Sequence, residues 1–203
     1  MKRASEIARE SLERIKAMPR PEPEPARDMS DDRRYMVEQS FRHVFPARWL
    51  GIEPTEPLER GLYLSGNVGT GKTHVAVGHA KATGLLRGST PMWCSTPLWL
   101  AETRASYNGG EAAKDYRDFI RTRLLVIDDL GVEKGSEWAQ ESIYCLIEAA
   151  YESETLCIIT SNLSLSDLSR RLGARIASRI AEMCDIRRMD GGDRRVSMAR
   201  GAS

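Results

Sequence analysis

The sequence predicts an α/β protein built on a parallel β-sheet, and three observations lead to this fold class. Short apolar segments typical of strands alternate with helical segments from residue 60 onward. This alternation indicates βαβ crossovers, which join parallel strands. The segment Leu124–Ile127 is apolar at every position, as expected of a strand covered on both faces. A glycine-rich loop over residues 66–71 separates the first strand segment from the first helical segment.

The strands and helices are expected in strict alternation. Strand segments lie at Gly61–Ser65, Pro91–Cys94, Leu124–Asp128, Leu156–Ser161 and Cys184–Met189. Helical patterns lie between them, over about residues 71–84, 97–122, 136–152 and 165–182. Glycines predict breaks at residues 108–110 and at Gly173. Before the first strand, residues 30–59 supply four side chains that can pack on the core: Phe41, Val44, Phe45 and Trp49.

The N-terminal part of the chain divides into a helical segment and a linker. Apolar residues recur at helical spacing over residues 1–18, and four prolines follow between residues 19 and 25. Proline-rich segments form extended, semi-rigid linkers. We therefore expect residues 1–26 to form an amphipathic helix with its tether, and residues 27–203 to form the main domain. The helix is either a charged tail without a role or a partner-binding element, and the sequence leaves both open.

The composition is that of an ordinary soluble globular protein. The 203 residues include 30 Lys and Arg against 29 Asp and Glu, so the net charge is +1 and nucleic-acid binding would need a local basic patch. Without a long apolar run or a signal peptide, a cytoplasmic protein that does not contact membranes is expected. The cysteines at positions 94, 145, 157 and 184 fit no zinc spacing and are expected to be buried free thiols.

The segment Gly66–Thr73 fits the phosphate-loop pattern G-x-x-x-x-G-K-[ST] at every fixed position. Such a loop binds phosphates through backbone N–H groups and the N-terminus of the following helix, and its glycines keep side chains out of the way. Lys72 is placed to reach the β- and γ-phosphate oxygens, and the Thr73 hydroxyl to ligate Mg²⁺. A chance glycine turn is disfavoured, because a strand precedes the loop and a helix follows it. On that helix, His74 is expected to be partly buried rather than a base.

Two further strand ends carry polar side chains suited to phosphate chemistry. The strand at Leu124–Ile127 ends in Asp128 and Asp129, and the following strand ends in Asn162. Ligands of α/β sheets bind at these carboxyl ends. Asp128 is placed to hold Mg²⁺, and Asp129 to orient or deprotonate an attacking water. Asn162 either hydrogen-bonds the γ-phosphate or the water, or simply begins a turn.

Four arginines lie on the last helical segment: Arg170, Arg171, Arg175 and Arg179. The last three are four residues apart, so they are expected to share one face. No acidic residue lies between Arg170 and Arg179. These side chains therefore either form a solvated face or bind an anion, such as a neighbour's phosphate or nucleic acid.

In combination, the loop GNVGTGKTH, the strand LLVIDDLG, the strand end TSN and the segment RIASRIAE resemble the AAA+ ATPases of the DnaC/DnaI helicase-loader and IstB-like group, over residues 45–196. The resemblance implies a P-loop NTPase fold. Its parallel sheet would have five strands in the order 5-1-4-3-2, helices on both faces and no separate helical lid. The nucleotide would bind at Gly66, Asn67, Val68, Gly69, Thr70, Gly71, Lys72, Thr73 and His74, with Thr73 and Asp128 handling Mg²⁺.

The same resemblance implies catalytic roles for residues outside the loop. Asp129 stands where other AAA+ proteins have a catalytic Glu, and Asn162 matches the sensor-1 position. Arg179 matches the arginine finger that reaches the ATP of an adjacent subunit, with Arg175 as its helper one turn earlier. Near the C-terminus, residues 191–195 resemble the closing G-x-S-Y-R element of the family, with an arginine in place of the tyrosine.

The function implied is that of an ATP-dependent helicase loader, similar to those carried by phages or prophages. ATP and Mg²⁺ would be its cofactors, and its ATPase activity would be weak without partners. It would bind single-stranded DNA, bind a replicative helicase through the N-terminal helix, and form a homo-oligomer when ATP is bound. Two alternatives stay open: an IstB-type transposition helper that binds duplex DNA and a transposase, and an ATP-dependent adaptor that does not hydrolyse ATP.

Overall fold

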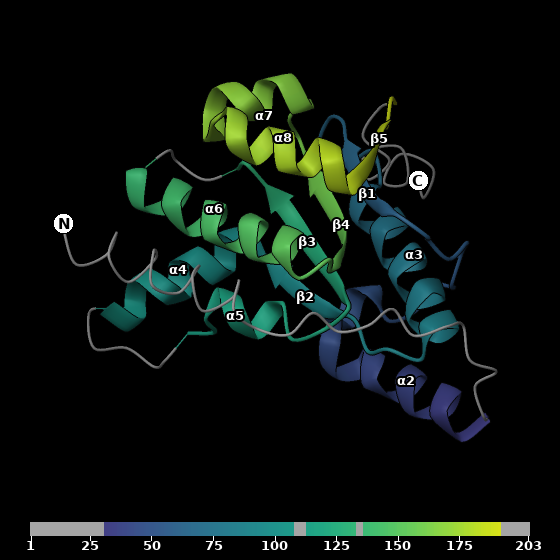
Figure 1. Ribbon diagram of the computed structural model, residues 1–203. Helices are drawn as coiled ribbons and strands as arrows, with labels where there is room; N and C mark the ends of the chain where they lie inside the picture. Colours follow the sequence, from purple (N-terminus) through teal and green to yellow (C-terminus); the bar gives the residue numbers. More distant parts are fainter. Residues whose placement is uncertain (1–30, 108–112, 133–135, 192–203) are drawn as a thin grey trace, which may run out of the picture.

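A computed structural model describes residues 31–107, 113–132 and 136–191, which form one parallel sheet with helices on both faces (Figure 1). The strands are β1 (Gly61–Ser65), β2 (Met92–Ser95), β3 (Leu124–Leu130), β4 (Leu156–Ser161) and β5 (Cys184–Arg188). Their order in the sheet is β2-β3-β4-β1-β5, and every neighbouring pair is parallel. This is the predicted order read from the other edge, so the predicted fold class is confirmed.

The helices divide into two groups on opposite faces of the sheet. One face carries α2 (Asp31–Val44), the 3-10 helix η1 (Ala47–Trp49) and α3 (Lys72–Arg87). The other carries α4 (Thr96–Tyr107), α5 (Tyr116–Phe119), α6 (Glu137–Glu152), α7 (Leu165–Leu172) and α8 (Ala174–Met183). Alternate residues of β3 belong to the two cores, with Leu124 and Val126 on the α3 side and Leu125 and Ile127 on the α6 side. This explains why that strand is apolar throughout.

Helix α2 lies in the segment for which the sequence predicted only packing side chains. Phe41 and Phe45 are buried against the sheet, as expected, and Val44 and Trp49 pack at the edge of the same core. Asp31 and Asp32 lie in the first turn of α2, and Arg42 and His43 lie in the last. These charges suit the helix dipole at both ends.

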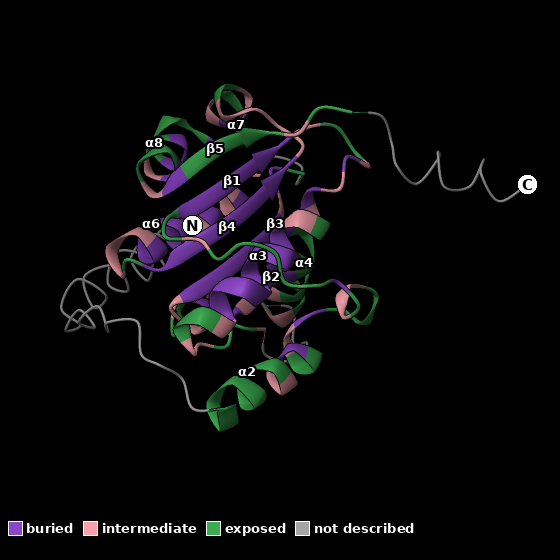
Figure 2. Cartoon of the chain, turned by 90° about the vertical axis from the view of Figure 1, so that its right-hand side faces the viewer, coloured by how far each residue is buried: buried purple, intermediate pink, exposed green. Residues whose placement is uncertain are grey.

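Strand β5 is an exposed edge strand, in agreement with its place at the end of the predicted strand order. Only Cys184 is buried, and the remaining residues of β5 are exposed (Figure 2, green). The strand pairs with β1 over its full length and is followed by Met189, whose N–H donates to the Ser65 carbonyl at 2.7 Å. Within the described residues no helix follows β5.

Several smaller predictions have clear outcomes. All four cysteines are buried and free, as expected. His74 is exposed, so the expectation of partial burial is wrong, because it lies on the outer face of the first turn of α3. None of the described helices is long and apolar enough to cross a membrane. The N-terminal helix expected over residues 1–18, its proline linker and the closing element beyond Gly191 lie outside the described residues.

Candidate functional site

The glycine-rich loop connects the end of β1 to the start of α3, as the motif predicts. Gly66, Gly69 and Gly71 have φ angles of 148°, 81° and 91°, which L-residues with side chains rarely adopt. A Cβ on Gly66 would also overlap the carbonyl oxygen of Met189, just beyond β5. Glycine is therefore required at the first position of the loop for both backbone conformation and space.

The loop and the helix after it have the features of an anion site. Gly71, the N-cap of α3, provides no side-chain hydrogen bond, so its N-terminal N–H groups are not capped by that residue. The buried Lys72 ammonium lies inside the loop and donates to the carbonyl oxygens of Gly66 and Asn67, each at 2.8 Å. The loop thus gathers a positive charge and backbone donors at one point, which is what a phosphate group requires.

Asn162, the residue that follows β4, reaches the same point. Its Oδ1 accepts a hydrogen bond from the Lys72 ammonium at 2.9 Å. Asn162 and Lys72 are 90 residues apart in sequence and meet because β1 and β4 are neighbours in the sheet. The structure therefore brings the strand-end asparagine to the phosphate loop, where its side chain could contact a bound phosphate.

Asp128 is the centre of a hydroxyl–carboxylate cluster at the carboxyl end of β3. Its Oδ1 accepts from Thr73 Oγ1 at 2.9 Å and from Thr160 Oγ1 at 2.8 Å. Burial raises the pKa of Asp128, an effect opposed by the Thr160 hydroxyl, reinforced by the Asp129 charge and opposed by the Thr73 hydroxyl. The carboxylate is only 4% exposed, so these two donors compensate part of its desolvation.

Thr160 is a member of the site that the sequence analysis missed. It is fully buried in β4, and its hydroxyl also accepts the backbone N–H of Asp129 at 2.9 Å. Asp129 has a φ of 58°, a left-handed conformation that is unfavourable for a residue with a side chain. One hydroxyl thus fixes the carboxylate of Asp128 and the backbone of Asp129. The polar pair Thr160 and Ser161 at the end of an apolar strand was the available signal.

The cluster also suits a magnesium ion that is shared with a nucleotide. The Thr73 hydroxyl and the Asp128 carboxylate are the hard oxygen donors that Mg²⁺ prefers, and Oδ1 of Asp128 takes both hydroxyl bonds. The described residues contain no group of three or more His, Cys, Asp or Glu that could hold a metal. An ion here would therefore need phosphate oxygens and water to complete its coordination.

The arginines of α7 and α8 do not form a single row. Gly173, with a φ of 103°, ends α7 and precedes α8, so Arg171 lies on a different helix from Arg175 and Arg179. The expectation that these three share one face is wrong for Arg171, because the chain changes direction at the glycine. Arg175 is exposed and lines a groove between α6 and the α7–α8 junction.

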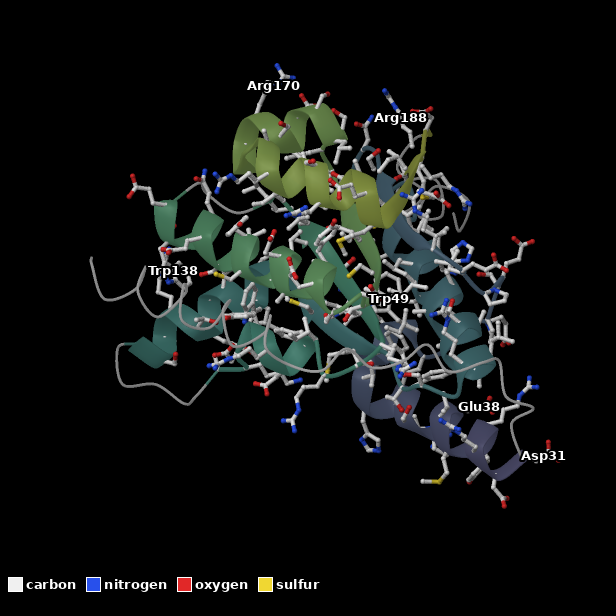
Figure 3. The ribbon with its side chains drawn as sticks, in the orientation of Figure 1. Asp31, Glu38, Trp49, Trp138, Arg170 and Arg188 are labelled. Carbon is white, nitrogen blue, oxygen red and sulfur yellow. The ribbon has the colours of Figure 1, made fainter. Side chains whose placement is uncertain are left out.

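Two of these arginines have acidic partners, and both partners lie outside the segment between Arg170 and Arg179. Arg170 points outward from α7 (Figure 3) and pairs with Asp167 in its own helix. Arg179 pairs with Glu148 of α6, with Nε to Oε2 at 3.0 Å and Nη2 to Oε1 at 3.2 Å. Glu148 is 31 residues away in sequence, so no reading of the arginine-rich segment alone could have found it.

Phosphate loop, strand-end acids and parallel sheet together define a P-loop protein of the AAA+ class. Residues 58–197 match the family model described as IstB-like ATP binding protein. The chain therefore belongs to this family of ATP-binding proteins.

Two curated relatives are replication proteins. The chromosomal replication initiator protein DnaA of Gloeobacter violaceus is 32% identical over 123 residues, 59% of this chain and 27% of that protein. The replicative helicase loader DnaC of Escherichia coli K12 is 24% identical over 118 residues, 57% of this chain and 48% of that protein. The chain thus spans about a quarter to a half of the length of these relatives.

A crystal structure of the DnaC helicase loader has a similar fold. Its TM-score is 0.57 at 28% sequence identity, and the match covers 82% of this chain and 94% of that one. The chain is therefore an AAA+ protein related to helicase loaders of the DnaC type.

Proposed function

We propose that this protein is an ATP-driven helicase loader that binds ATP and Mg²⁺, single-stranded DNA and a replicative helicase. The observation that carries the proposal is the convergence of Lys72, Asn162 and Asp128 at the carboxyl edge of the sheet. These groups come from three different elements and meet around one phosphate loop. The similarity to DnaC favours helicase loading among the functions that such a site could drive.

The residues of the site divide the work of ATP hydrolysis. Residues 66–74 would bind the phosphates, with Lys72 moving its hydrogen bonds from loop carbonyls to phosphate oxygens. Thr73 and Asp128 would hold Mg²⁺, which neutralises charge on the phosphates when it is bound. Asp129 would orient or deprotonate the attacking water, and Asn162 would sense the γ-phosphate.

Arg179 would complete the site of a neighbouring copy rather than its own. Helix α6 begins after β3 at the carboxyl edge of the sheet and ends before β4 at the amino edge. Glu148 lies roughly 16 Å along this helix from its first residue, and Arg179 is paired with it. The guanidinium is therefore displaced from its own phosphate loop, which supports action in trans within a homo-oligomer. Arg175, one turn closer to the carboxyl edge, would assist.

Protein and DNA partners follow from the relatives and the chain organisation. A replicative helicase is the partner expected of a DnaC-like loader, and residues 1–26 are the segment proposed to bind it. Removal of these residues should abolish helicase binding and leave ATP binding intact.

The family match favours a second candidate, a transposition helper of the IstB type that binds duplex DNA and a transposase. The third, a non-hydrolysing adaptor, would bind ATP without turnover, and Asp129→Asn would then change nothing.

Steady-state ATP hydrolysis distinguishes the three candidates. Turnover would be measured alone, with single-stranded DNA, with duplex DNA and with a replicative helicase. Stimulation by single strands, or altered turnover with helicase, is the expected result for a loader. Stimulation by duplex DNA alone would favour the transposition helper, and ATP binding without turnover under any condition would favour the adaptor.

A further inference from the structure

The guanidinium of Arg179 contacts side chains of α6 and α8 on its own chain. Glu148 accepts from Nε and from Nη2, and the Tyr151 ring lies against the guanidinium with Cζ 4.1 Å from the ring centroid. Glu182 lies 3.7 Å from Nη1 and accepts the Tyr151 hydroxyl at 2.8 Å. The side chain that matches an arginine finger is thus held by contacts within its own chain.

The contacts leave one edge of the guanidinium for a second anion. Glu148 occupies the inner edge, formed by Nε and one hydrogen of Nη2. An arginine has five N–H donors in a planar fork, so Nη1 and the other Nη2 hydrogen form an outer edge. Among the described residues, only Glu182 faces this edge, through the longer ion pair with Nη1. A phosphate could therefore bind Arg179 without displacing Glu148.

The difference in burial makes the ion pair between Arg179 and Glu148 persistent, and the ion pair between Arg179 and Glu182 replaceable. The Glu148 side chain is 8% exposed, whereas that of Glu182 is 49% exposed. Departure of Arg179 would leave a buried carboxylate without its charge partner, which is strongly unfavourable. Loss of the contact with Glu182 would return a half-exposed carboxylate to water at little cost. Arg179 is thus expected to act from where it lies.

We propose that Glu148 is a positioning residue, which together with the ring of Tyr151 fixes the direction in which Arg179 presents its outer edge to the nucleotide of a neighbouring copy. Glu182 competes for that edge until a phosphate replaces it. This inference rests on the proposed function, in which Arg179 acts in trans. It adds residues of α6 to a site otherwise made of the phosphate loop, the start of α3, two strand ends and the arginines of α8.

The test compares Glu148→Gln with the wild type in the full-length protein. Glutamine keeps the shape of the side chain but loses the negative charge that accepts hydrogen bonds from both Nε and Nη2 of Arg179. Glu152→Gln, the same substitution on the same helix, is the matched control. Each variant is assayed for ATP turnover over a range of protein concentrations with saturating Mg²⁺ and ATP, for affinity toward a fluorescent ATP analogue, and for urea unfolding.

The expected result for Glu148→Gln is a fall in kcat of about ten- to a hundredfold at high protein concentration, with little change in KM or analogue affinity, since a misdirected group loses catalysis rather than binding. Glu152→Gln should behave as the wild type. Glu182→Gln should keep or raise turnover at low protein concentration. In an Arg179→Ala background, Glu148→Gln should have no further effect, because it acts only through the arginine.

Two sets of results overturn the proposal and are distinguishable. If the wild type shows no turnover, or if Arg179→Ala retains it, the action of Arg179 in trans fails and positioning fails with it. If Arg179→Ala loses turnover but Glu148→Gln keeps it, only the positioning role of Glu148 fails. If Glu148→Gln does not fold, Tyr151→Leu is tested in its place. The same fall in kcat is expected for this variant, and an unchanged kcat would overturn the proposal.

Discussion

Replacement of Thr160 by valine removes one hydroxyl and leaves the shape of the buried side chain nearly unchanged. The hydroxyl donates to Asp128 at 2.8 Å and accepts from the Asp129 N–H at 2.9 Å. Loss of the bond to the carboxylate should cost about 1.5–3 kcal/mol, and the unpaired, partly buried N–H of Asp129 about 1 kcal/mol. No cavity is created, so no packing loss adds to these values. We therefore expect Thr160→Val to lower the free energy of unfolding by about 3 kcal/mol.

Urea denaturation at neutral pH measures this difference, with Thr160→Ser as the matched control. Serine keeps the hydroxyl and loses a methyl group, so it should cost only about 1 kcal/mol. Thr160→Val should also reduce ATP turnover, because Asp129 loses the bond that fixes its left-handed backbone. A valine variant as stable as the serine variant, with full turnover, would refute the role assigned to this hydroxyl.

Three further predictions concern other parts of the described chain. Gly66→Ala should prevent nucleotide binding and lower stability, because the methyl group would overlap the Met189 carbonyl; normal binding of a fluorescent ATP analogue would contradict this. Asp115→Asn should cost about 0.5 kcal/mol in urea unfolding at pH 7, since it removes the charge that pairs with Arg117 at the N-terminus of α5 and leaves a side chain that can still cap the helix. Partial burial raises the pKa of Asp115, but its bonds to Arg117 hold it below the ordinary value. Its stabilisation is therefore present above the unfolded-state pKa and lost as pH falls through the lower folded-state pKa, so wild type and variant should converge in acid. Phe41→Ala should cost about 3–5 kcal/mol by the same assay, and a loss below that of Asp115→Asn would contradict its place in the core.

The fold was largely predictable because its elements carry strong local signals. The fully apolar run at Leu124–Ile127 and the glycine pattern of the phosphate loop each determine structure within a few residues. Helix α2 was missed because most of its surface is exposed and charged, and only Val37 and Phe41 within it are buried. Its acidic first turn and basic last turn were the signals that could have revealed it.

The site was predictable where the sequence motif itself supplies the geometry, and not where distant residues meet. Lys72 and Thr73 follow from the loop pattern, and Asp128 from the end of its strand. The pairing of Arg179 with Glu148 depends on the packing of α8 on α6, which periodicity does not encode. The position of Thr160 beside Asp128 depends likewise on the register between β3 and β4.

The binding of ATP by the phosphate loop is the central claim, and equilibrium titration with a fluorescent ATP analogue in the presence of Mg²⁺ tests it most directly. The wild type should bind the analogue, and Lys72→Ala should abolish that binding, because the buried ammonium is the charge that lies in the phosphate loop. Circular dichroism would establish that the variant is folded. If a folded Lys72→Ala variant binds the analogue with the same affinity as the wild type, the phosphate loop is not the ATP site, and the proposed function that depends on it is contradicted.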